Sequence, residues 1–193
     1  MEELLDWIVE HPQIKMVSIY ALSTENLNRS ETELKHLWNI YQSELENMLT
    51  SEKIKKHEVK VRIVGNTNSW RKDVRKTARK IMKETENYTR SVLNILIAYG
   101  SQYEILNAIK KVVKFGVKSV PPIRDSFVNY LMINRPVDLV IRTGGYHRLS
   151  NFLLYQAAYS EIYFSPTLWP SFSKREFNQI MKWFWKQKRK YGK

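Results

Sequence analysis

Arginine, glycine and serine are concentrated in one short polar segment that follows an apolar run and begins at Arg142. Arg142 and Arg148 carry planar guanidinium groups whose N–H donors suit phosphate oxygens. Gly144 and Gly145 allow the backbone to turn sharply or to approach a ligand closely. Ser150 is a residue type that caps helices, and a helix beginning there adds partial positive charge. The segment predicts a diphosphate-binding turn; the alternative is a tight turn whose arginines pair with surface acids.

A second polar cluster also follows an apolar, strand-like run. It contains Ser23, Thr24, Glu25, Asn26 and Arg29. Ser23 and Asn26 can hydrogen-bond a phosphate or orient a neighbouring arginine, and Glu25 can hold a cation or pair with Arg29. The alternative is an Asx-type loop that caps the next helix.

A third candidate is a magnesium site formed by Glu161 and His147. Glu161 is bordered by aromatic residues, and hard cations prefer oxygen ligands such as its carboxylate. The alternatives are that Glu161 is a structural ion-pair partner and that His147 is polar surface.

Composition limits the classes of protein that these residues can serve. The chain has 193 residues, 43% of them hydrophobic, which favours one folded domain over residues 1–193. The 32 Lys and Arg against 19 Asp and Glu give a net charge of +13 and predict an anionic partner. The absence of cysteine excludes disulfides and thiol catalysis. No apolar stretch approaches the roughly 18–20 residues of a membrane span, so we expect a cytoplasmic protein, soluble or peripheral to a membrane.

Strand-like and helix-like segments alternate along the chain, which predicts an α/β fold. The strand candidates are mostly apolar throughout, as in parallel sheets covered by helices; they are residues 16–22, 59–64, 92–98, 137–141 and 162–164. The helix candidates are residues 31–56, 69–86, 102–114, 122–132, 150–159 and 174–190, and residues 116–122 form the one plausible flexible break. Gly65, Gly100, Gly144 and Gly145 each follow a strand candidate. Because ligands bind outside the carboxyl ends of parallel strands, the polar clusters found there are the natural site candidates.

Four segments together resemble the cis-prenyltransferases of the undecaprenyl diphosphate synthase type. "VSIYALSTENLNRS" resembles the family's S-x-E-N-W-x-R segment, "VRIVGN" its R-x-x-G strand end and "LNILIAYGSQYEI" its L-N-x-x-x-x-Y-G-x-x-x-E-I segment. "VDLVIRTGGYHRLSNFLLYQAAYSEIYFSPTLWPSF" is similar to the longest signature almost throughout. The resemblance implies one domain with a mostly parallel central sheet flanked by helices. It implies an enzyme that condenses isopentenyl diphosphate onto an allylic diphosphate, farnesyl or geranylgeranyl, with cis double bonds, to give a long-chain polyprenyl diphosphate.

The resemblance also assigns roles to the candidate residues. Arg142, Arg148 and Ser150, with the glycine pair, bind the diphosphate of isopentenyl diphosphate; Ser23, Glu25, Asn26 and Arg29 line the catalytic wall; Glu161 and His147 lie near Mg²⁺ and the second subunit of a homodimer. The closing "KRKYGK" resembles the family's R-x-G tail, with Lys190 in place of the arginine. Leu27 replaces the usual tryptophan, and Tyr146 stands where glutamate is common.

The largest departure from the family pattern is at the front of the chain. The family's M-D-G-N-x-R loop, with its catalytic aspartate, and the strand before it have no counterpart, and the chain opens with the helix-like "MEELLDWIVEHPQIK". We therefore expect that the first strand is missing and that the chain is shortened or is completed by a partner.

Two alternative functions are considered. One is a non-catalytic subunit of a heteromeric cis-prenyltransferase. Another is a nucleic-acid-binding protein, which the scattered basic residues and the lack of zinc, RNP-like or helix-turn-helix motifs oppose. A separate expectation concerns the basic, amphipathic helix predicted over residues 174–190. We favour packing of its apolar side within the fold, and we add peripheral membrane contact as a second role of this helix.

Overall fold

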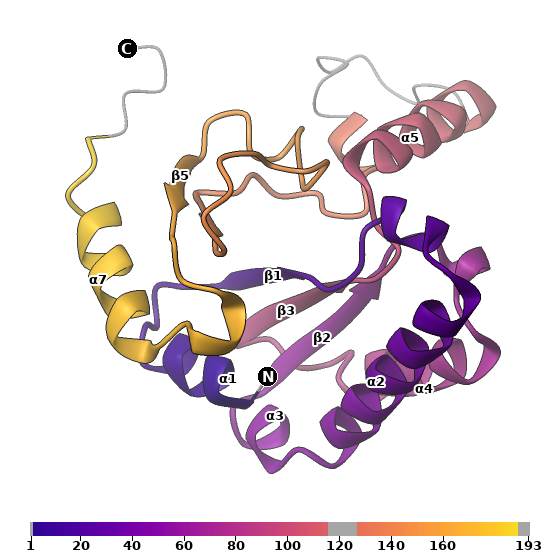
Figure 1. Ribbon diagram of the computed structural model, residues 1–193, viewed down its shortest axis with the longest axis horizontal. Coiled ribbons are helices and arrows are strands. Elements are labelled where there is room, and N and C mark those ends of the chain that lie inside the picture. Colours follow the sequence, from indigo (N-terminus) through magenta and orange to yellow (C-terminus); the bar gives the residue numbers. More distant parts are fainter. Residues whose placement is uncertain (1, 116–126, 189–193) are drawn as a thin grey trace. The chain divides into compact units, whose positions relative to one another are not determined.

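The computed structural model describes residues 2–115 and 127–188 (Figure 1). The chain forms two compact units, Met1–Gly100 and Ser101–Lys193. Every strand pair in the described residues is parallel and joined by crossover connections, as the apolar runs predicted. The interpretation of residues 1–193 as one domain stays a prediction. No helix within the described part of the chain is long and apolar enough to span a bilayer.

The first unit is a three-stranded sheet in the order β1-β3-β2, flanked by helices (Figure 1). Its elements are α1 (Glu2–Val9), β1 (Met16–Tyr20), a 3₁₀ turn (Glu25–Asn28), α2 (Glu31–Thr50), α3 (Glu52–Lys56), β2 (Val59–Val64), a 3₁₀ turn (Thr67–Ser69), α4 (Lys72–Glu84) and β3 (Ser91–Leu96). The register aligns Ser18 with Asn94 and Asn94 with Arg62. The carboxyl ends of the strands therefore lie at one edge of the sheet, and the loop after β1 begins there.

Helices α2 and α4 pack together against one face of this sheet. Leu45 of α2 and Val74 of α4 are buried in the same core as Val61 and Leu93 of the strands. Alternation along β2 buries Val59, Val61 and Ile63, which therefore share one face. Ser30 begins α2 with a complete capping box, in which its side chain and that of Glu33 bond each other's backbone N–H.

Gly65 directly follows β2, at a position that only glycine fits. Its φ is +145°, and a Cβ placed there would lie 1.9 Å from the carbonyl oxygen of Ile97. The glycine thus lets two strand ends approach closely, as its place after a strand predicted.

The second unit is built on a parallel pair of strands. Its elements are α5 (Ser101–Phe115), β4 (Leu139–Arg142), β5 (Glu161–Phe164), a 3₁₀ turn (Trp169–Ser171) and α7 (Lys174–Phe184). Ser173 caps α7 by accepting a hydrogen bond from the Glu176 N–H. Phe177, Ile180, Met181 and Phe184 of α7 are buried, so this apolar stripe packs within the fold as favoured from the sequence.

Several predicted boundaries were wrong. The predicted helix 31–56 is two helices separated at Ser51, the helix predicted over 69–86 begins at Lys72, and α7 ends at Phe184. The predicted helix 122–132 is helical only at residues 127–128 of its described part and continues as turns. The predicted break at 116–122, residues 122–126 and most of the closing "KRKYGK" lie outside the described residues.

The helix predicted over 150–159 is absent, and the segment is a series of turns. Ser150, Asn151 and Leu153 have φ of +49°, +62° and +43°, a left-handed conformation that cannot continue a right-handed helix. Asn151 instead accepts hydrogen bonds at the start of α5, from the Ser101 N–H to its backbone oxygen and from the Gln102 N–H to Oδ1. The segment therefore supplies partners to the orphan N–H groups of another helix.

Candidate active site

Arg142, the last residue of β4, is the centre of the arginine cluster. Its Nη1 donates a hydrogen bond of 2.9 Å to Ser150 Oγ. The Tyr146 ring lies beside both guanidinium groups, with its centroid 5.7 Å from Arg142 Cζ and 4.3 Å from Arg148 Cζ. A cation over an aromatic face is attracted to the ring, so Tyr146 and Ser150 together restrict where the arginines point. Arg148 is exposed and Arg142 is half-buried.

The two glycines shape this turn and are not free to cradle a phosphate with their N–H groups. Gly144 N–H donates to the Thr167 carbonyl oxygen at 2.8 Å, and Gly145 N–H donates to that of Ser165 at 2.9 Å. Their φ values of +92° and +75° explain why glycine stands at both positions. The predicted helix start at Ser150 is wrong, because residues 150–159 form turns. Diphosphate binding by this turn stays a prediction, and its two arginine side chains are the charged donors that it offers.

The Ser23–Arg29 cluster forms a closed loop after β1. Ser23 donates to Asn26 Oδ1 from its N–H at 3.1 Å and from its Oγ at 3.0 Å, while the Asn26 N–H donates to Ser23 Oγ at 3.2 Å. The loop is held at the sheet edge because the Thr24 N–H donates to the Tyr99 carbonyl oxygen. Asn26 thus has an Asx-type structural role, while its Nδ2 donates to no other residue in the described ranges.

The two charged members of this cluster do not pair as one sequence interpretation suggested. Arg29 lies 3.8 Å from Glu33, and Glu25 accepts a hydrogen bond from Thr24 Oγ1. Both Arg29 and Glu25 are exposed. Hydrogen bonds from Ser30 hold the pKa of the Glu33 carboxyl below its ordinary value, with Arg29 adding a smaller effect. Arg29 is therefore only loosely held, and its guanidinium can turn to an anionic ligand.

The structure does not bring Glu161 and His147 into one cluster. The His147 ring packs against Phe164, with ring centroids 4.8 Å apart. Glu161 lies three residues earlier on β5, about 10 Å along the strand and on the opposite face, because side chains alternate. No group of three or more His, Cys, Asp or Glu side chains in residues 2–115 and 127–188 could hold a metal ion. A magnesium role for Glu161 and His147 therefore stays a prediction.

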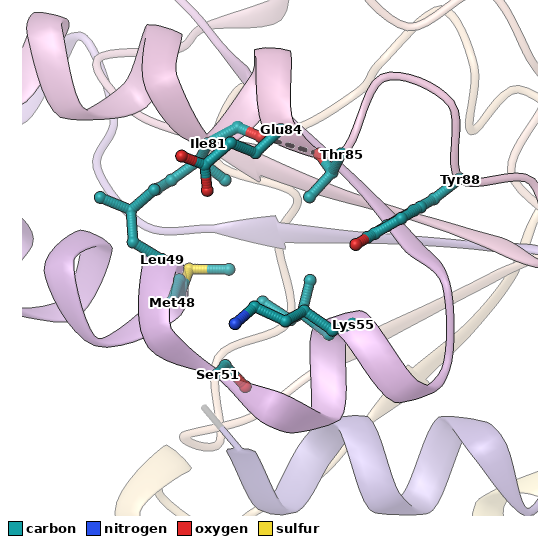
Figure 2. A pocket seen from close by; sticks show the side chains of 9 residues that line it. Met48, Leu49, Ser51, Lys55, Ile81, Glu84, Thr85 and Tyr88 are labelled. Atoms are coloured by element: carbon teal, nitrogen blue, oxygen red, sulfur yellow. Dashed lines mark hydrogen bonds between the residues drawn. The ribbon is translucent and has the colours of Figure 1, made fainter.

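A small pocket in the first unit lies apart from the Ser23–Arg29 cluster (Figure 2). Its volume of about 30 Å³ is room for roughly one water molecule. The pocket is lined by Ser51, Thr85 and Tyr88, among others, and the Ser51 Oγ is buried without a hydrogen-bond partner in the described part of the chain. The pocket is too small for a prenyl substrate.

Comparison with known proteins places these clusters in a family. The prenyltransferase family model of undecaprenyl diphosphate synthases matches residues 1–192. The chain belongs to the undecaprenyl diphosphate synthase family. The match includes the Ser23–Arg29 cluster and the Arg142–Ser150 cluster alike, so the sequence resemblance to the cis-prenyltransferases is confirmed.

Three relatives illustrate the similarity to this undecaprenyl diphosphate synthase family. A tritrans,polycis-undecaprenyl-diphosphate synthase (geranylgeranyl-diphosphate specific) from Thermoplasma volcanium is 38% identical over 199 residues, covering 100% of this chain and 77% of the relative. A ditrans,polycis-undecaprenyl-diphosphate synthase ((2E,6E)-farnesyl-diphosphate specific) from Buchnera aphidicola is 39% identical over 187 residues, covering 94% of this chain and 74% of the relative. The crystal structure of a probable undecaprenyl diphosphate synthase from Campylobacter jejuni matches with a TM-score of 0.90 and 34% identity, covering 100% of this chain and 90% of that one.

Tyr146 is the residue of this family member that sequence reasoning undervalued. It was noted only as a departure from the family pattern, yet its ring contacts both candidate diphosphate-binding arginines. Its position between Arg142 and Arg148 in a glycine-containing turn is the signal that could have revealed it.

Proposed function

We propose that this chain is a cis-prenyltransferase that elongates an allylic diphosphate with isopentenyl diphosphate to give a long-chain polyprenyl diphosphate. The observation that carries the proposal is the arginine cluster: Arg142 and Arg148 are set by Ser150 and Tyr146 at the end of a parallel strand, inside the family match. Guanidinium groups held in this way suit the oxygens of a diphosphate.

The reaction joins two prenyl units. The C–O bond of the allylic diphosphate breaks and diphosphate leaves with the electron pair. The terminal alkene carbon of isopentenyl diphosphate then bonds to the allylic carbon, and a proton lost from C2 restores a double bond with cis geometry. The leaving diphosphate develops negative charge, so positioned cationic donors lower the barrier to its departure.

We assign this chain's residues the following parts. Arg142 and Arg148 bind the diphosphate of isopentenyl diphosphate, and Ser150 orients Arg142. In the loop after β1, Asn26 Nδ2 and Arg29 donate to a substrate oxygen, while Ser23 fixes Asn26 through the hydrogen bonds described above. Glu25 is an exposed neighbour of these donors and is the remaining catalytic candidate. Gly144 and Gly145 shape the turn.

Mg²⁺ is our proposed cofactor, and it would neutralise diphosphate charge. Magnesium is usually bound through one or two carboxylates together with substrate phosphates, so a complete protein cage is not required. The allylic substrate we propose is farnesyl or geranylgeranyl diphosphate, supported by the specificities in the relatives' names. We further propose that the protein is cytoplasmic and forms a homodimer. Sedimentation velocity of the purified chain tests the dimer, which should have a mass near twice 23.1 kDa.

The decisive experiment is incorporation of labelled isopentenyl diphosphate into lipid by the purified chain, with Mg²⁺ and farnesyl or geranylgeranyl diphosphate. We expect polyprenyl products whose masses differ by one isoprene unit, and their loss on Arg148→Gln. Arg175→Gln on α7 removes an exposed arginine outside both clusters and should retain activity. If no product forms either with or without native cell extract, the proposed function is contradicted. If product forms only when extract is added, the chain works with a partner.

A further inference from the structure

Helix α4 carries a stripe of basic side chains that the reaction does not use. The stripe consists of Lys72, Lys76, Arg79, Lys80 and Lys83, all exposed. At 3.6 residues per turn these positions occupy about 100° of the helix circumference and extend for about 16 Å. Val74, Ala78 and Ile81 are buried on the opposite side of the helix. The stripe therefore faces directly away from the core of its unit.

The stripe is poorly neutralised by neighbouring acids. Lys80 lies 3.8 Å from Glu84, and both side chains are mostly exposed. Asp73, the other acid of α4, is held by Arg71 at 2.7 Å. An exposed ion pair contributes little, so Lys80 can exchange Glu84 for another anion. The other four members of the stripe form no ion pair with residues in the described ranges.

Charge is also unevenly distributed along the first unit. Residues 51–90 contain 13 basic residues (Lys and Arg) and 5 acidic residues (Asp and Glu). Residues 1–50, in contrast, contain 3 basic and 9 acidic residues. Helix α2, which packs beside α4, is acidic in its first turn and contributes Gln42 to a hydrogen bond with Thr77 of α4. The positive potential is therefore concentrated on the α4 side and does not arise from the net charge alone.

We propose that this stripe docks the protein on an anionic phospholipid bilayer. The inference rests on the proposed function, because a long polyprenyl diphosphate is insoluble in water and must reach a bilayer. A flat row of lysines and arginines matches a surface of phosphate headgroups. A nucleic acid is the other polyanion to consider, but α4 contains no aromatic residue on which a base could stack. The bilayer is the partner that the observations favour.

The test is co-sedimentation of the full chain with vesicles of phosphatidylcholine alone or with 30% phosphatidylglycerol. Wild-type protein should bind only the vesicles that contain phosphatidylglycerol, and added salt should release it. Each basic residue near such a surface changes the partition coefficient about fivefold, so Lys72→Gln/Lys76→Gln/Lys83→Gln should weaken binding roughly a hundredfold. The matched control, Lys110→Gln/Lys111→Gln/Lys182→Gln, removes the same charge from exposed positions of α5 and α7 and should change binding less than threefold.

Several outcomes overturn the docking proposal. They are equal binding by the α4 triple variant and wild type, an equal loss in the control variant, and equal binding to neutral vesicles. Tight binding of labelled poly(U) that depends on the same lysines, without vesicle binding, assigns the stripe to RNA instead. Isopentenyl diphosphate turnover with a short water-soluble allylic substrate, measured without vesicles, should be unchanged in both variants. If the wild-type protein shows no such turnover, the proposed function is contradicted. The vesicle experiment still tests the docking proposal, because it does not depend on turnover.

Discussion

A double-mutant cycle at Arg142 and Ser150 tests whether the serine acts on the substrate directly or through the arginine. The hydrogen bond from Arg142 Nη1 to Ser150 Oγ is 2.9 Å long. If Ser150 serves mainly to orient Arg142, Ser150→Ala loses an interaction with a charged donor. We estimate the cost at about 1–1.5 kcal/mol, since the pair is partly exposed, or roughly five- to tenfold in the Kd of isopentenyl diphosphate.

Arg142→Lys keeps the positive charge but loses the planar fork and the bond to Ser150. Its expected cost is about 1.5–3 kcal/mol, or roughly 10- to 150-fold in Kd. Adding Ser150→Ala to this variant should then change Kd less than about twofold, because the serine no longer has its arginine partner. Isothermal titration calorimetry with isopentenyl diphosphate measures all four corners of the cycle.

The control for this cycle is Ser173→Ala, which removes a hydroxyl from the cap of α7 in the same unit. It should reduce stability by about 1 kcal/mol and leave Kd unchanged in both backgrounds. If Ser150→Ala costs the same factor with Arg142 and with Lys at position 142, the two residues bind substrate independently and our assignment of Ser150 as a positioning residue is wrong.

Three further predictions follow from individual contacts. Gly65→Ala should lower the free energy of unfolding by about 3 kcal/mol or more, because its Cβ would meet the Ile97 carbonyl oxygen at 1.9 Å. Gly144→Ala, whose Cβ would meet Leu168 at 3.7 Å, should lower it by only about 1 kcal/mol, and urea titrations measure both values. Asn26→Asp keeps the acceptor for Ser23 but replaces the Nδ2 donor with an anion, so kcat/KM should fall about 100-fold, whereas Asn28→Asp in the same turn should be near wild type; equal losses would exclude a specific donor role. The folded pKa of Glu33 is lowered, so its contribution to stability should be present above the ordinary value of 4.5 and disappear as pH falls through the folded pKa; a stability difference between wild type and Glu33→Gln that stays constant from pH 7 to pH 3 would contradict this.

The strands were the most predictable part of the fold. Val59–Val64 was placed without error, and the other strands differ from prediction by one or two residues at their ends. Their signal is strong because both faces of a parallel strand are covered, so apolar residues run on without interruption. Of the four glycines predicted to follow strands, Gly65, Gly144 and Gly145 have positive φ, whereas Gly100 does not.

The break at Ser51 could also have been read from the sequence. The apolar repeat of α2 continues through Leu45 and Met48, and a continued helix would place Glu52 and Lys55 on the buried face. Ending the helix at Thr50 instead lets Ile54 of α3 enter the core, where it is 2% exposed. The phase of the repeat carried this information, although no glycine or proline marks the break.

The turn structure of residues 150–159 could not be predicted from local sequence, because tertiary contacts decide it. Leu153 and Ala157 are spaced as in a helix, and both are buried. However, Gln156 donates from Nε2 to the buried Glu104 carboxylate and to the Ile133 carbonyl oxygen, and Asn151 binds the start of α5. These long-range hydrogen bonds outweigh the strain of left-handed residues, roughly 1–2 kcal/mol for each. The strain lies directly beside Arg142 and its partner Ser150, so the same contacts that prevent a helix also fix the serine hydroxyl where the arginine needs it.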